Sequence, residues 1–370
     1  MSPLAIQTKN PLTDKIKRVG LRILIFIIKK TPSAVHGILA WILSWILSVT
    51  LKRERSIAIS QLNFALPEHN AFNIYRESLY GAILTVIECF RINDLLKMMN
   101  QNTSHDDPID SIAITKEKSN NTSEIGCVKI FGPDEFVGNR MLSNILSGKK
   151  DKTPEYNQGA VCLGAHLGNF ELMAASFAKQ GYPLTVIARK ANNLILQEVI
   201  EKVRRDYGVE MLWREDSATS KHLIGAIKNN RFICALIDQD IALENAFAPF
   251  FGMPASHPVA PIKIAVRFKK PVYTFFTRRV CLGFHKVFIN RIQWEDVLEN
   301  PEIFILTEYS RLLEEFIRSY PDQWVWWHRR WRRQEGVDYE KYPDKLPTTK
   351  NYVSWIKSMT QNNVQESKTC

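Results

Sequence analysis

Short apolar runs alternate with helical patterns through the middle of the chain. Apolar runs of strand length cover 160–165, 182–188, 209–213 and 231–237. Between them, apolar residues recur at helical spacing over 170–180, 193–207 and 217–229. Strands that alternate with helices predict right-handed βαβ units. We therefore expect an α/β fold with a mostly parallel central sheet flanked by helices.

A histidine and a glutamate stand five positions apart where the first strand passes into a helix. Asn169 is a good N-cap for a helix that begins at Phe170, which puts His166 in the preceding loop and Glu171 in the first turn. A carboxylate beside an imidazole fixes one tautomer and raises its basicity, so we expect a dyad that takes a proton from a hydroxyl. The alternative is a strand-end histidine beside a solvated acid.

Ionisable residues also follow two later strands. Arg189 follows the 182–188 run, and Asp238 follows the 231–237 run. Because the carboxyl ends of parallel strands lie at one edge of the sheet, we expect His166, Arg189 and Asp238 to come together there. Arg189 could stabilise a developing oxyanion. Asp238 could hold Arg189 or position a substrate, and the sequence leaves both roles open.

The N-terminal part contains an uncharged apolar run over 35–51, between Lys30 and Lys52. Its length approaches the roughly 20 residues that span a bilayer. Basic flanks on both sides fit a helix in the membrane interface or a short anchor at least as well as a full crossing, and a buried core helix is the alternative. We therefore expect a membrane-anchoring helical region over 1–56, a catalytic domain over 57–340 and a polar tail over 341–370.

Composition limits the possible partners. The formal net charge of +11 implies an acidic partner: nucleic acid, an anionic membrane face, a phosphorylated lipid or an acidic carrier protein. The six cysteines have no close pair at metal-ligand spacing, which favours reduced thiols and a cytoplasmic catalytic domain. The sequence has neither a Walker-type glycine loop nor a G-x-S-x-G elbow, so we expect no nucleotide, metal or other cofactor and no covalent intermediate.

Tryptophan and arginine alternate in a block at 324–333. Such a block could stack single-stranded nucleic acid, or it could lie at a membrane interface and bind phosphate groups. A structural role for buried tryptophans is a third reading. The rest of the chain contains no nucleic-acid module, so we expect no nucleic-acid partner.

Several motifs in this order resemble the bacterial lipid A biosynthesis (late) acyltransferase family over about residues 31 to 333. They are Ala165-His166-Leu167-Gly168-Asn169-Phe170-Glu171, Ile187-Ala188-Arg189, Ile237-Asp238-Gln239-Asp240, the phenylalanine-rich loop at 249–255, the block at 321–331 and, upstream, 63–67. His257 departs from the family, which commonly has a small hydroxyl residue there. The polar insertion at 101–123 is longer than expected and is typical of a solvated loop.

The resemblance implies transfer of a lauroyl or myristoyl chain from acyl carrier protein to a hydroxyl of a Kdo-bearing lipid A precursor, a phosphorylated glycolipid. It places the protein at the inner membrane with its catalytic domain on the cytoplasmic side. The catalytic residues would be His166, Glu171, Arg189 and Asp238, and the substrate-binding residues Asn169, Gln239, Asp240, Arg329 and Arg330. Two alternatives stay open: another acceptor, such as a lysophospholipid, aminolipid or other glycolipid, or a non-catalytic binder of anionic lipid or RNA.

Overall fold

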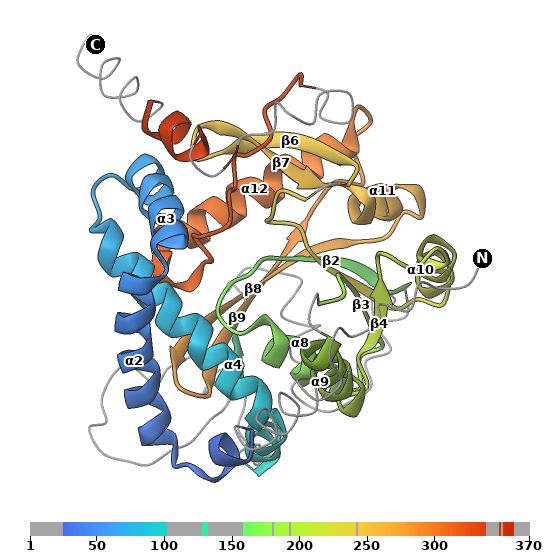
Figure 1. Cartoon of the computed structure of the whole chain (residues 1–370). Coiled ribbons are helices and arrows are strands. Elements are labelled where there is room, and N and C mark those ends of the chain that lie inside the picture. Colours follow the sequence, from blue (N-terminus) through green and yellow to red (C-terminus); the bar gives the residue numbers. More distant parts are fainter. Residues whose placement is uncertain are drawn as a thin grey trace.

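Within the residues that the structure describes, seven strands form one central sheet (Figure 1). The structure is a computed structural model, and it describes residues 25–101, 128–131, 158–179, 181–191, 194–241, 243–337, 348 and 351–358. In spatial order the strands are β1 (Val128–Phe131), β9 (Phe284–Ile292), β8 (Val272–Cys281), β2 (Ala160–Gly164), β5 (Phe232–Leu236), β3 (Leu184–Ala188) and β4 (Glu210–Trp213). The strands β8 and β9 are antiparallel, and the other neighbouring pairs are parallel.

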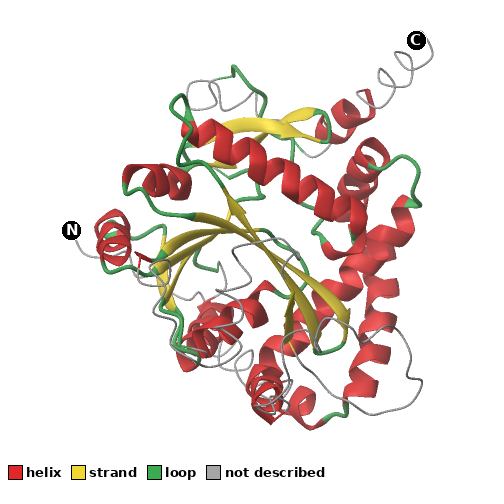
Figure 2. Ribbon diagram, turned by 180° about the vertical axis from the view of Figure 1, so that it is seen from behind, coloured by secondary structure: helices red, strands yellow, loops and turns green. Residues whose placement is uncertain are grey.

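Helices cover both faces of this sheet (Figure 2). Helices α8 (Phe170–Lys179), α9 (Leu194–Asp206) and α10 (Thr219–Lys228) lie within about two residues of the predicted ranges. Helices α11 (Ala260–Arg267) and α12 (Pro301–Ser319) follow later in the chain, with a two-stranded antiparallel ribbon of β6 (Asn245–Phe250) and β7 (Met253–Pro258). The predicted α/β fold with a mostly parallel sheet flanked by helices is confirmed.

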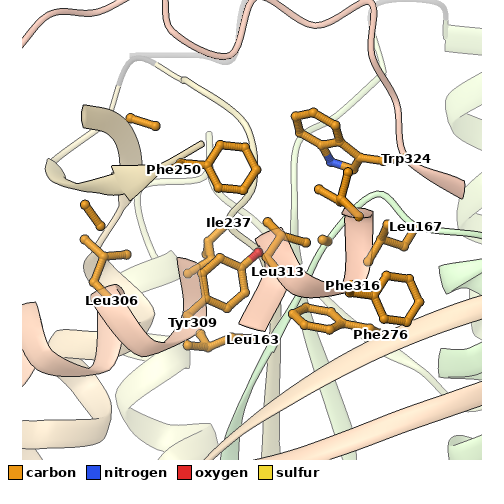
Figure 3. Packing of buried hydrophobic residues seen from close by; sticks show 14 of the residues in the cluster. Leu163, Leu167, Ile237, Phe250, Phe276, Leu306, Tyr309, Leu313, Phe316 and Trp324 are labelled. Atoms are coloured by element: carbon orange, nitrogen blue, oxygen red, sulfur yellow. The ribbon is translucent and has the colours of Figure 1, made fainter. Parts of the chain in front are cut away.

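Strand β2 shows why this sheet needs helices on both sides. Its five residues are all buried, and the first four alternate between two hydrophobic clusters. Val161 and Leu163 join the cluster that contains Tyr309 and Leu313 of α12 (Figure 3), whereas Ala160 and Cys162 join the cluster beneath α8. A strand buried on both faces is apolar throughout, as expected for a parallel sheet.

In the part of the chain that the structure describes, helices α2 (Ser33–Thr50), α3 (Lys52–Ala65) and α4 (Ala71–Gln101) precede the sheet. Helix α2 packs along α4 (Figure 1). It buries small residues, Ala40, Ser44 and Ser48, and it exposes large ones such as Trp41 and Ile46. Among the described helices, none is long and apolar enough to cross a membrane alone; α2 and α3 meet that criterion only as a pair bent by 90°.

Part of the expected polar tail packs on the core. Residues 351–358 are helical, and Tyr352 and Ile356 are fully buried in the cluster that contains Trp331. The polar insertion at 101–123 lies outside the described residues, apart from Gln101 at the end of α4. The proposed division of the chain at residues 56 and 340 stays a prediction.

Candidate active site

The sheet register brings His166 and Asp238 together. Gly164, the last residue of β2, pairs with Leu236, the last residue of β5. His166 and Asp238 each stand two residues beyond these strand ends. Because neighbouring parallel strands end at the same edge, equal offsets place the two side chains side by side.

Asp238 holds the backbone and the imidazole of His166 at once. The Nδ1 of His166 lies 2.8 Å from Oδ1 of Asp238, and the His166 backbone N–H donates to Oδ2 over 2.9 Å. Trp324 donates its indole Nε1–H to the same Oδ2 over 2.9 Å. The Asp238 side chain is 1% exposed, whereas that of His166 is 26% exposed and lines a cavity. With Nδ1–H donating to the carboxylate, the lone pair of neutral His166 is on Nε2.

These contacts set the protonation of the pair. Burial lowers the pKa of His166, but the charge of Asp238 and its hydrogen bond outweigh burial, so the pKa is raised above 6.5. Burial raises the pKa of Asp238, yet the neighbouring imidazole and the hydrogen bonds hold it well below its ordinary value. Asp238 is therefore ionised, and His166 is a stronger base than an isolated imidazole.

The sequence predicts that Glu171 holds the imidazole of His166, but in the structure Glu171 binds another residue. Arg204 of α9 donates to both of its carboxylate oxygens, with Nε 2.9 Å from Oε2 and Nη2 bonded to Oε1. The predicted dyad partner of His166 is thus corrected to Asp238. Glu171 and Arg204 still line the same cavity, and the charge of Glu171 contributes to the raised pKa of His166.

Asn169 positions the loop that carries His166. Its Oδ1 accepts the N–H of Leu172 over 2.9 Å, which is the predicted N-cap of α8. Its Nδ2 donates over 2.8 Å to Glu88, a buried acid of α4. Because both ends of its amide have these partners inside the protein, the predicted role of Asn169 in substrate binding gives way to a positioning role.

Glu88 is the centre of a buried polar cluster that the sequence analysis missed. Besides Asn169, it accepts hydrogen bonds from Arg279, from the backbone of Gly283 and from Nε2 of His285. Burial raises the pKa of Glu88, but the charges and hydrogen bonds of Arg279 and His285 prevail and lower it strongly. The cluster ties α4 and the β8–β9 hairpin to the start of α8. A lone acid in the apolar stretch at 83–90 was its one signal in the sequence.

Gly168 allows the same loop to pass close to β8. It adopts φ +48°, and a Cβ at this position would lie 2.6 Å from the carbonyl oxygen of Thr277. Its N–H donates to the carbonyl of Gln323 over 3.0 Å, and Leu167 forms an isolated bridge with Trp324. The Gln323–Trp324 segment therefore braces the loop from the opposite side.

Asp240 and the C-terminal arginines form a second buried ion cluster. Arg332 and Arg333 both bind its carboxylate, and the Asp240 N–H donates to Nε2 of His328 over 2.9 Å. Burial lowers the pKa of His328 to about 4, and the charge of Arg330 adds to this effect. Asp240 lines the cavity as predicted, but its carboxylate is engaged by two arginines, which leaves it a structural rather than a substrate-binding role.

Arg330 and His257 form another buried pair. Arg330 is fully buried, and it donates to the carbonyl of Ser256 and, over 2.6 Å, to Nε2 of His257. Nδ1 of His257 lies 3.0 Å from the carbonyl oxygen of Ile237, the residue before Asp238. The buried pair thus supports the strand end that carries Asp238, and the substrate-binding role of Arg330 stays a prediction.

The cavity beside His166 has a volume of about 800 Å³. Its body lies between α8 and the sheet and is apolar, and its mouth carries charged groups. The apolar lining includes Met173, Ala174, Phe177, Val186, Phe232 and Phe275. A cavity lined by many apolar side chains and by a base suits a flexible hydrocarbon chain whose reactive end lies beside His166.

Two further predicted residues line this cavity. Arg189 follows β3 at the expected edge, but its side chain is 60% exposed and pairs with Glu215 at 4.0 Å. Gln239 also lines the cavity, which fits the substrate-binding role predicted for it. No group of three or more His, Cys, Asp or Glu side chains among the described residues converges on a metal-binding point.

Comparison with known proteins gives the site a chemical class. Residues 16–333 match the family described as bacterial lipid A biosynthesis acyltransferase. The chain belongs to this family. The buried carboxylate–imidazole pair at the sheet edge is therefore the candidate centre of an O-acyltransferase of lipid biosynthesis.

Part of the chain is also similar to two phosphatidylinositol mannoside acyltransferases of Mycobacterium tuberculosis, from strains CDC 1551 / Oshkosh and ATCC 25618 / H37Rv. The identity to each is 25% over 131 residues, or 34% of this chain. The match spans 42% of each relative, less than half of its length. These relatives are consistent with an acyltransferase that acts on a lipid acceptor.

Proposed function

We propose that this lipid acyltransferase moves a fatty acyl chain from acyl carrier protein to a hydroxyl of a phosphorylated glycolipid of the lipid A precursor type. The observation that carries the proposal is the contact of 2.8 Å between His166 and the buried Asp238 at the mouth of an apolar cavity of about 800 Å³. It combines an oriented base with room for a hydrocarbon chain.

The chemistry follows from the tautomer of His166. Nε2 takes the proton of the acceptor hydroxyl while that oxygen attacks the thioester carbonyl, and Asp238 stabilises the imidazolium that forms. The carbon–sulfur bond then breaks, and the leaving thiolate takes the proton from His166. The products are an ester and the free thiol of the carrier. Because the acceptor oxygen attacks the thioester directly, no covalent enzyme intermediate forms in this mechanism.

Negative charge develops on the carbonyl oxygen and needs fixed donors. The backbone N–H groups of His166, Leu167 and Gly168 donate to Asp238, Ala165 and Gln323, so they serve the loop itself. We place the oxyanion instead at the start of α8, where the helix dipole favours negative charge. Arg189 at the cavity mouth supplies further positive potential.

We further propose that α2 lies in the cytoplasmic face of the inner membrane. Its packing against α4 buries small side chains, while large apolar side chains such as Trp41, Ile42 and Ile46 are exposed. This arrangement suits a helix whose outer face meets lipid. Replacing these three residues by Ser should release the protein from liposomes in flotation, and full-length protein that is soluble at low salt without detergent would contradict the placement.

The function is tested with purified protein and acyl carrier thioester, with lipid A precursor, lysophosphatidic acid or RNA added in parallel tubes. The proposal predicts a product of the precursor that is heavier by one acyl unit in mass spectrometry. Acylation of the lysophospholipid alone would reassign the acceptor. Tight RNA binding without acyl transfer in any tube would overturn the enzymatic function.

A further inference from the structure

A second, smaller hollow lies beside the active-site cavity. Its volume is about 230 Å³, and Arg53 of α3 lines it together with Trp327, Arg329 and Arg332. Whole small-molecule sites usually measure roughly 300–1,000 Å³, so this hollow has room for one headgroup rather than a whole ligand. Glu54 also lines it, so the lining contains three arginines and one glutamate, and one of the arginines, Arg332, also binds Asp240.

The three arginines crowd one another. Burial lowers the pKa of Arg329, and the positive charges of Arg332 and then Arg53 lower it further. A bound anion would relieve this repulsion and favour the charged form of Arg329. Arg332 is fixed in place because its Nε and Nη2 lie 3.3 Å and 3.5 Å from the carboxylate oxygens of Asp240. A fixed guanidinium binds an anion with less loss of side-chain entropy.

The hollow shares a wall with the active site and lies close to the proposed membrane helix. His328 and Arg332 line both the hollow and the cavity of His166. Arg53 stands three residues after Thr50, the last residue of α2. A group bound here would sit between the lipid-facing helix and the base. This is where the headgroup of a membrane-embedded acceptor would lie while its hydroxyl reaches His166.

We propose that Arg53, Arg329 and Arg332 bind a phosphate group on the headgroup of the lipid acceptor. The assignment to the acceptor rests on the acyl-transfer function proposed above. Guanidinium forks match phosphate oxygens in two-point fashion. Trp327 and Ile57 give the hollow apolar walls suited to the carbon skeleton of a headgroup.

Binding is tested first, without any reaction. Calorimetry of the full-length protein in detergent with dihexanoyl phosphatidic acid should give a binding isotherm that inorganic phosphate displaces, and dihexanoyl phosphatidylcholine should bind far more weakly. Arg53→Gln and Arg329→Gln should each weaken binding by about tenfold to a hundredfold, since each removes a charge-assisted hydrogen bond. Arg267→Gln on α11, an exposed arginine outside both cavities, is the matched control and should bind like the wild type.

Kinetics then separate acceptor from donor. Arg53→Gln and Arg329→Gln should raise KM for the phosphorylated acceptor about tenfold or more, leave KM for the acyl carrier thioester unchanged, and lose this difference on a dephosphorylated acceptor. Unchanged phosphatidic acid binding in both variants, or a rise confined to the thioester KM, would overturn the proposal. If binding behaves as expected but the wild type transfers no acyl group, the anion site stands and the proposed function fails.

Discussion

Both carboxylate oxygens of Glu171 accept hydrogen bonds from the guanidinium of Arg204. Glu171 therefore affects His166 through its charge, which raises the pKa of the imidazole, while its carboxylate binds Arg204. Asp238 contacts the imidazole directly. Glu171, which lines the cavity, and Asp238, which is buried behind the imidazole, therefore have separate roles. This difference can be measured.

Glu171→Gln and Arg204→Gln should each lower kcat, by about tenfold or more, because each leaves a charge near the base without its partner. If the pair acts as a unit, the double variant should fall no further than the worse single variant. Single-turnover transfer rates of the three variants test this coupling. Losses that multiply in the double variant would show instead that Glu171 serves His166 independently of Arg204.

Asp238→Asn should reduce transfer by about 10²- to 10⁴-fold, since the amide neither fixes the reactive tautomer nor stabilises the imidazolium. It should also change the pH dependence. Catalysis needs neutral His166, so activity falls as pH drops through the pKa of His166, which Asp238 raises above 6.5. Without that charge, burial still lowers the pKa and only the weaker effect of Glu171 raises it, so the acid limb of kcat/KM should move to lower pH. If the acid limb of Asp238→Asn, followed between about pH 5 and 9, coincided with that of the wild type, the observed titration would belong to a group other than His166.

The sequence predicted most of the strands and helices around the site because each is a local pattern. Alternating apolar runs and capping residues, such as Asn169, depend on neighbours in the chain. The partner of His166 depends instead on strand order. β5 lies between β2 and β3, and that order places Asp238 beside His166 and leaves Arg189 one strand further away. The spacing of His166 and Glu171 also fitted a dyad. Only the tertiary structure shows that Arg204 on α9 binds the carboxylate of Glu171 instead.

The polar clusters were invisible for the same reason. Glu88 and Arg279 are 191 positions apart, and the Gln61 side chain bonds the backbone of Trp326 and Arg330 near the other end of the chain. Apolar packing leaves a periodic signature in the sequence, whereas a buried ion pair leaves two isolated charged residues. Burial of the tryptophans was one of three readings of the C-terminal block, but the bond from Trp324 to Asp238 depends on the folded geometry.

Glu88→Gln should destabilise the protein by about 3–5 kcal/mol, because Arg279 would remain buried without its counter-charge. Thermal unfolding in one detergent compares this variant with Glu77→Gln, an exposed glutamate on the same helix, which should change stability by less than about 0.5 kcal/mol. If both variants melt together with the wild type, the cluster does not stabilise the loop.

Ala174→Leu should shift the donor preference toward shorter acyl chains. Ala174 lines the cavity on α8, and the larger side chain would take up space that the end of a long chain needs. Since one methylene in an apolar pocket is worth about 1–3 kcal/mol, kcat/KM for the longest donor should fall about tenfold or more relative to a shorter one. Ala178→Leu, one turn further along and outside the cavity lining, is the control for helix packing. Equal preference in both variants would mean that the acyl chain binds elsewhere.

In the proposed mechanism, His166, held by Asp238, is the base of acyl transfer. The most direct test of this role is the rate at which purified His166→Ala transfers acyl groups from carrier thioester to lipid acceptor, beside His222→Ala, an exposed histidine of α10, as control. We expect His166→Ala to lose about 10²- to 10⁴-fold in transfer rate while it unfolds at the same temperature as the wild type. His222→Ala should show normal turnover. Near-normal transfer by folded His166→Ala would contradict this mechanism.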